Sequence, residues 1–245
     1  MLRLALATAL AIVALPLGAR TPLPLPEVVA AELILPTDRY DHAVLGDALE
    51  WAGLLLTVDT CPPCADRRLD TVRITLPPDR VFEDVVARVV DVTGDGLAEV
   101  VVVEADAARG AALVVYDANG GRVATPWIGQ RHRWLAPAAV GDFDGDGRPE
   151  IAYVDRPHLA RELVFVRLDG ERLVEVARAP GFSNHRIGEA TITGALRRCG
   201  GVDEVILPDA GWGRVMAARI ADGRVVARDA GRYRGPDSIA RAAGC

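Results

Sequence analysis

The stretch VGDFDGDGRPEIAYV, residues 140–154, decides the fold. An acidic, glycine-rich loop ends at Glu150 and passes directly into a run of apolar and β-branched residues. The pattern recurs at Glu99 and, in shortened form, at Glu204, which places the three glutamates 51 and 54 residues apart. A second marker, the turns Asn119-Gly120, Asp169-Gly170 and Asp222-Gly223, repeats at 50 and 53 residues. Two markers with one period indicate a repeat architecture.

Each period predicts four short strands. In the best-preserved repeat we expect them at residues 138–142, 151–155, 163–167 and 173–177, with a tight turn before the last. The strands are rich in Val and bounded by Gly, Asp and Pro, and no sustained helical period is present, so the sequence predicts an all-β fold.

The chain should hold four repeats in one domain. A degraded first repeat is indicated by Leu45-Gly46-Asp47, followed by apolar runs at 54–58 and 72–76. The expected repeats span about residues 38–80, 81–130, 131–183 and 184–232, within a single domain at 20–245. Residues 28–35 and 233–245 resemble strands that would pair the two ends of the chain. These patterns predict a closed β-propeller of four to five blades, and an open β-solenoid with exposed edges is the alternative.

The acidic loops predict calcium sites, because calcium takes six to eight oxygen ligands. In the loop at 142–150, carboxylates and one backbone carbonyl would come from Asp142, Asp144, Asp146, Arg148 and Glu150. In the loop at 91–99 the corresponding residues are Asp91, Thr93, Asp95, Leu97 and Glu99. Thr93 replaces a carboxylate, so we expect this second site to be the weaker. The alternative is that both loops are only acidic turns.

The segments at 140–147 and 150–152 resemble the FG-GAP/VCBS repeat, which also occurs in the integrin α-subunit propeller. The resemblance covers about residues 40–230 and implies a propeller whose calcium loops stiffen the first hairpin of a blade. In that family the ligand usually binds on the opposite face, and seven blades are commonest, for which this chain is too short. The family includes adhesins, surface proteins and accessory domains of enzymes, so it leaves the function open.

The amino terminus and the cysteines predict export. Residues 1–19 read as a signal peptide, with Arg3 before an apolar run at 4–17 and cleavage near Ala19, for delivery to the periplasm or the outside of the cell. A membrane anchor is the alternative, although the run is short for a span. The mature chain should not span a membrane.

Four cysteines allow three disulfide pairings. We expect Cys199 to pair with Cys245, because they lie at corresponding places in successive repeats, and Cys61 to pair with Cys64. A redox role for the Cys61-Pro62-Pro63-Cys64 segment is the alternative.

The loops opposite the calcium side are rich in arginine, histidine and aromatic residues, which suit an anionic or sugar-like ligand. The candidate ligand-binding residues are Arg39, Tyr40, His132, Arg133, Trp134, Arg156, His158, His185, Arg186, Trp212 and Arg214. The alternative is a solvated rim with Trp134 and Trp212 packed between blades.

We expect a module that binds a protein or glycan, or a scaffold whose only ligand is calcium, rather than an enzyme. A hydrolase using the same face is the alternative, but Ser183 beside His185 lacks a nucleophile-elbow motif. The formal net charge of -6 argues against nucleic-acid binding.

Overall fold

A computed structural model describes residues 25–46 and 49–245 and shows an all-β protein with three antiparallel sheets. The predicted signal peptide at residues 1–19 and Asp47 lie outside the described residues. No helix within the described ranges is long and apolar enough to cross a membrane.

The first sheet joins two layers of strands. The first layer holds β1 (Glu27–Thr37), β2 (Glu50–Asp59) and β3 (Leu69–Thr75), and the second holds β5 (Arg88–Val90), β6 (Glu99–Asp106), β7 (Gly110–Tyr116) and β8 (Arg122–Ala124). The short strand β4 (Arg80–Phe82) connects them, because it pairs with β2 at Trp51 and with the carboxyl end of β6. Strands β4 and β5 therefore share one edge of β6, separated by a short bulge.

The other two sheets are four-stranded meanders. One contains β9 (Leu135–Gly141), β10 (Glu150–Asp155), β11 (Glu162–Asp169) and β12 (Arg172–Pro180). The other contains β13 (Ala195–Arg197), β14 (Glu204–Pro208), β15 (Arg214–Ala221) and β16 (Arg224–Arg232). The four strands predicted for the repeat at 131–183 are confirmed, with bounds that differ by a few residues.

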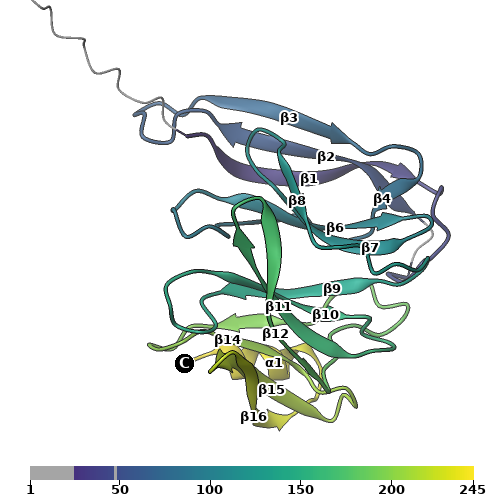
Figure 1. Cartoon of the computed structure of the whole chain (residues 1–245), viewed down its shortest axis with the longest axis vertical. Coiled ribbons are helices and arrows are strands. Elements are labelled where there is room, and N and C mark those ends of the chain that lie inside the picture. Colours follow the sequence, from purple (N-terminus) through teal and green to yellow (C-terminus); the bar gives the residue numbers. More distant parts are fainter. Residues whose placement is uncertain (1–24, 47–48) are drawn as a thin grey trace, which may run out of the picture.

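The layers are stacked along the long axis of the molecule, from β1–β3 at one end to β14–β16 and helix α1 (Pro236–Ala243) at the other (Figure 1). Buried apolar residues fill the space between neighbouring layers. Leu54, Phe82 and Val102 belong to the cluster between the first two layers. Phe165 and Leu207 belong to the cluster between the last two.

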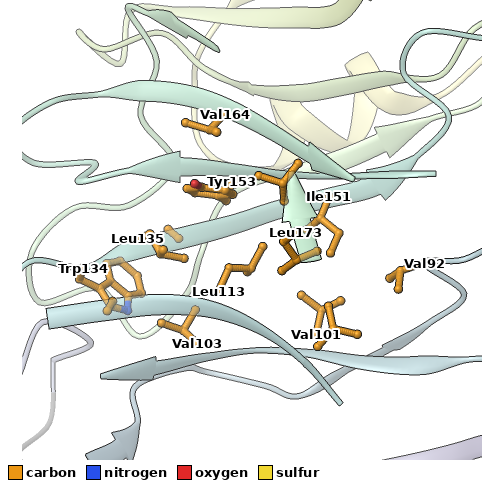
Figure 2. Packing of buried hydrophobic residues seen from close by; sticks show 14 of the residues in the cluster. Val92, Val101, Val103, Leu113, Trp134, Leu135, Ile151, Tyr153, Val164 and Leu173 are labelled. Atoms are coloured by element: carbon orange, nitrogen blue, oxygen red, sulfur yellow. The ribbon is translucent and has the colours of Figure 1, made fainter. Parts of the chain in front are cut away.

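The central cluster draws on every repeat. Val103 and Leu113 of the second layer face Leu135 and Tyr153 of the third across this cluster (Figure 2). Val44, from the loop after β1, and Ile192, from the loop before β13, pack into the same cluster. Strands of the second and third layers and loops of the first and last repeats therefore share one core.

The expected closing strand at the carboxyl end is wrong. Residues 236–243 form α1, which begins with Pro236 after Gly235 and buries Ile239 against the last sheet. Strand β1 pairs with β2 along its length and, within the described residues, with no strand from the carboxyl end. Proline at the first helical turn and an alanine-rich sequence favour a helix here.

The first repeat also departs from the pattern. Strands β2 and β3 lie where strands were expected, but the loop at 38–46 does not lie with the acidic loops. Its Val44 carbonyl accepts a hydrogen bond from the Gly188 amide at 3.1 Å, and Tyr40 contacts His132. The likeness of Leu45-Gly46 to Val140-Gly141 therefore does not reflect an equivalent position.

Both predicted disulfides are present, Cys199–Cys245 and Cys61–Cys64. Although Cys245 follows a helix rather than a strand, the helix returns the chain to the loop after β13. Disulfides are typical of oxidising compartments and fit an exported chain.

Candidate functional site

The Asp142 loop (residues 142–150) connects β9 to β10 and is held by its own backbone. The Oδ1 atom of Asp142 accepts the amide of Gly145 at 2.7 Å, and Oδ2 accepts that of Gly147 at 2.9 Å. Both glycines have positive φ, 80° and 87°, which lets the chain reverse around the carboxylate. Glu150 Oε2 accepts the amide of Phe143 at 2.9 Å.

The Asp91 loop (residues 91–99) connects β5 to β6 and has the same hydrogen bonds. Asp91 accepts the amides of Gly94 and Gly96 at 2.6 and 2.8 Å, and these glycines have φ of 82° and 86°. Glu99 Oε2 accepts the amide of Val92 at 2.9 Å. The two loops therefore have the same backbone conformation and the same hydrogen bonds.

The third and fifth positions of each loop also match. The amide of Asp146 donates to Asp144, at 3.0 Å, and the amide of Asp95 donates to Thr93 Oγ1, at 3.3 Å. At the seventh position the amides of Arg148 and Leu97 donate to the preceding aspartate, both at 2.8 Å. The expected carbonyl ligation by these two residues stays a prediction.

The donor set of the Asp142 loop suits a cation, but an arginine already occupies it. Carboxylate oxygens of Asp142, Asp144 and Asp146 lie within 4.8 Å of one another, as a metal site requires. The guanidinium of Arg167, on β11, donates to Asp144 Oδ2 at 2.7 Å and to Asp146 Oδ2 at 2.8 Å. It also donates through Nε to Glu150 Oε1 at 2.7 Å.

The Asp91 loop contains oxygen donors and no such arginine. Within residues 25–46 and 49–245, no arginine forms an ion pair with Asp91, Asp95 or Glu99. Burial raises the pKa of Glu99 to about 7, and although the Val92 amide opposes this, the charges of Asp95 and Asp91 add to it. Among the described residues, however, only Asp142, Asp144 and Asp146 bring three carboxylate oxygens close enough together to hold an ion, so the Asp91 loop does not present a comparable donor set.

The corresponding glutamate of the last repeat is also neutralised by arginine. Glu204 accepts hydrogen bonds from Arg197 and Arg228, each at 2.6 Å. These hydrogen bonds lower the pKa of Glu204, with Arg228 contributing most.

At the other end of the sheets, the four histidines of the chain lie close together. The rings of His42 and His132 stack with centroids 4.9 Å apart, and Tyr40 packs edge-on to His132 at 5.4 Å. His158 and His185 form a second pair, with ring nitrogens 3.0 Å apart. We call the four histidines and Tyr40 the histidine cluster.

Glu83, in the bulge between β4 and β5, lies beneath the histidine cluster and was missed by sequence reasoning. Its side chain is buried, and Oε1 lies 2.5 Å from Nδ1 of His42. Burial raises its pKa well above the usual range, and the neighbouring Asp84 adds to the rise. The indole of Trp134 donates to the Glu83 carbonyl at 2.9 Å. No local pattern identifies a glutamate that becomes buried between two layers.

Most of the histidine cluster is packed rather than open. Trp134, Tyr40 and His185 are 2 %, 3 % and 1 % exposed, and the cavity at the cluster measures about 30 Å³. Arg133 and Arg156 line this small cavity. This packing agrees with the alternative in which Trp134 is a buried structural residue rather than part of a ligand-binding face.

Two other candidates, Arg186 and Trp212, form a separate hollow together with Tyr233. The Cζ of Arg186 lies 4.1 Å from the ring centroid of Trp212, and the rings of Trp212 and Tyr233 are 5.1 Å apart at 73°. The hollow has a volume of about 390 Å³ and is also lined by Thr191 and Arg234. We call it the Arg186 hollow.

Two candidates lie apart from both groups. Arg39 donates to the carbonyl of Leu76 at 3.4 Å, and Arg214 donates to Asp229 at 2.7 Å. The serine considered for the hydrolase alternative, Ser183, donates to the Pro157 carbonyl at 3.0 Å. It is not hydrogen-bonded to an imidazole, so Ser183 and His185 do not form a nucleophile–base pair.

A family model described as an FG-GAP-like repeat matches residues 91–153. The match begins at the first residue of the Asp91 loop and includes the whole Asp142 loop, so the resemblance predicted from these loops is confirmed. No curated protein and no solved structure matches the chain.

Proposed function

We propose that this FG-GAP-repeat chain is an exported, calcium-stabilised module of propeller type that binds a protein or glycan partner through the Arg186 hollow. The observation that carries the proposal is the arginine held 4.1 Å from the indole of Trp212 at the wall of an open hollow.

The chemistry of the Arg186 hollow suits an acidic carbohydrate or an acidic protein side chain. Aromatic faces pack against the apolar faces of sugar rings, and the planar guanidinium fork binds carboxylates. Stacking on Trp212 orients the guanidinium of Arg186 before a ligand arrives, which lowers the ordering cost of binding. Thr191 and Thr193 supply hydroxyl groups for further hydrogen bonds.

A cluster shared by residues of all four repeats supports the propeller arrangement. Val44, Val101, Ile151 and Ile192 come from four successive repeats and pack together. A radial arrangement explains this, because only the inner parts of blades meet at a common axis.

Calcium has a structural role in this proposal. The acidic loops open the first full hairpins of the second and third layers, so a cation in a loop, whether calcium or a protein side chain, would hold the two strands of that hairpin together. Carboxylate, hydroxyl and carbonyl oxygens are the ligands that calcium prefers.

Binding can be tested with a panel of neutral and acidic oligosaccharides. We expect Arg186→Ala and Trp212→Ala each to weaken binding of an acidic ligand by at least about tenfold. Trp127→Ala is the matched control, because Arg109 stacks on Trp127 at 4.6 Å in a different part of the molecule. Equal losses in all three variants, or no binding by the unaltered chain, would contradict the proposal.

A further inference from the structure

Equivalent positions beside the two acidic loops hold opposite charges. Ile151 pairs with Val166 across β10 and β11, and Val100 pairs with Tyr116 across β6 and β7. One residue further along each ladder, Glu150 lies opposite Arg167, and Glu99 lies opposite Asp117. The two loops share their internal hydrogen bonds, so this position is where they differ most in charge.

Arg167 satisfies the carboxylates that a metal ion would otherwise bind. Its side chain is 13 % exposed and forms ion pairs with Asp144, Asp146 and Glu150. The remaining carboxylate, that of Asp142, accepts two amides of its own loop. Every carboxylate of the Asp142 loop therefore has a partner within the chain.

We infer that Arg167 is the resident cation of the Asp142 loop, which closes this loop without a metal ion. Calcium at this position would have to displace the guanidinium or lie beside it. A divalent ion a few ångströms from an arginine meets strong repulsion in a partly buried site. The same charge that stabilises the loop therefore opposes calcium.

At the Asp91 loop the same position adds negative charge. Asp117 follows β7 at this position, and its Oδ1 accepts the amides of Asn119 and Gly121 at 2.8 Å. This second part rests on the proposed function: the charge at this position opposes calcium at the Asp142 loop and does not oppose it at the Asp91 loop. The loop residues alone predict that the Asp142 loop binds calcium more tightly than the Asp91 loop, because Thr93 replaces a carboxylate.

The role of Arg167 can be tested without any metal. In excess chelator, Arg167→Gln should lower the melting temperature by roughly 5–10 °C, because it leaves three carboxylates uncompensated. Arg167→Lys keeps the positive charge but loses the planar guanidinium group. Its melting temperature should therefore lie between those of the unaltered chain and Arg167→Gln. Arg178→Gln is the matched control, since Arg178 pairs with Glu175 and Glu162 on the same sheet, away from the loops. A melting temperature of Arg167→Gln no lower than that of the control would overturn the inference.

Calcium binding, measured by equilibrium dialysis, tests the second part. We expect Arg167→Gln to bind about one calcium ion per chain more than the unaltered chain, and Asp142→Asn to bind as many ions as the unaltered chain. Loss of a bound ion in Asp142→Asn, or no gain of an ion in Arg167→Gln while the unaltered chain binds calcium, would overturn the inference. If the unaltered chain binds no calcium while Arg167→Gln is destabilised in chelator, the proposed calcium role fails and the role of Arg167 stands.

Discussion

The Nε2 atom of His158 lies 3.0 Å from the Nδ1 atom of His185, and these two rings form a directed chain of hydrogen bonds. The Nε2 atom of His185 lies 2.7 Å from the carbonyl oxygen of Glu189, which can only accept. In neutral His185 the proton is therefore on Nε2, and Nδ1 accepts the proton of His158. A second proton on His185 would place two donors face to face.

We expect acid to destabilise the protein through this pair. Burial lowers the pKa of His158 from 6.5 to about 4, and the charge of His185 adds to the shift. Burial also lowers the pKa of His185. The unfolded chain takes up these protons near pH 6.5, before the folded chain does, so the free energy of unfolding falls as the pH falls from about 6.5 towards 4.

Melting curves between pH 4 and 8 would measure this effect. His158→Gln should melt with a shallower decline in acid than the unaltered chain, whereas His132→Gln, on the more exposed side of the cluster, should keep the decline. Parallel curves for His158→Gln and the unaltered chain would show that the pair does not govern acid stability.

The two disulfides should contribute unequally to stability. Cys199 and Cys245 are separated by 46 residues, and Cys61 and Cys64 by 3. Closing a longer loop restricts the unfolded chain more, so removing the first pair should cost about 3–4 kcal/mol and removing the second about 1–2 kcal/mol. Urea denaturation of the two double alanine variants measures both values. An equal cost for the two pairs would count against the chain-entropy explanation.

The core between the last two layers should be sensitive to truncation at Phe165. This ring is fully buried and packs edge-on to Phe143, with centroids 5.1 Å apart at 63°. Phe165→Ala should lower the free energy of unfolding by about 3–5 kcal/mol. Leu159→Ala, at a side chain that is 61 % exposed, is the control and should change it by less than about 0.5 kcal/mol.

Helix α1 should keep the last sheet from associating with other molecules. Ile239 is 5 % exposed and packs against Ile206, Val215 and Ala217, which would be uncovered without the helix. A chain ending at Arg234 and carrying Cys199→Ser, which removes the thiol left without Cys245, should therefore self-associate, measured by light scattering after size-exclusion chromatography. Arg241→Ala, on the exposed side of the helix, should elute as the unaltered chain does; a monomeric truncated chain would disprove the covering role.

The strands of the second, third and fourth repeats could be predicted from sequence because their signals are local. Glycine turns, β-branched runs and the glutamates at 99, 150 and 204 fix each hairpin within a few residues. The carboxyl-terminal helix was not predicted, because the segment around Ile239 is too short for its apolar period to distinguish helix from strand. Gly235-Pro236 was the available signal, since proline is common at a helix start and rare inside a sheet.

The acidic loops were found from sequence, but the residue that neutralises one of them was not. Arg167 follows the Asp142 loop by a whole strand, so it meets the loop only when β10 and β11 pair. Working out the register between the strands predicted at 151–155 and 163–167 would have placed Arg167 opposite Glu150. Glu83 could not be found in this way, because its burial depends on contacts among layers far apart in sequence.

The two outer faces of the stack differ, because a helix covers one and exposed strands form the other. One face is sealed by α1 and fastened by the bond between Cys199 and Cys245. The other, on β1–β3, carries Glu32, Thr71 and Arg73, which are exposed and hydrophilic. A neighbouring molecule would therefore meet polar strand residues at one face and a helix at the other, so the two faces cannot be exchanged.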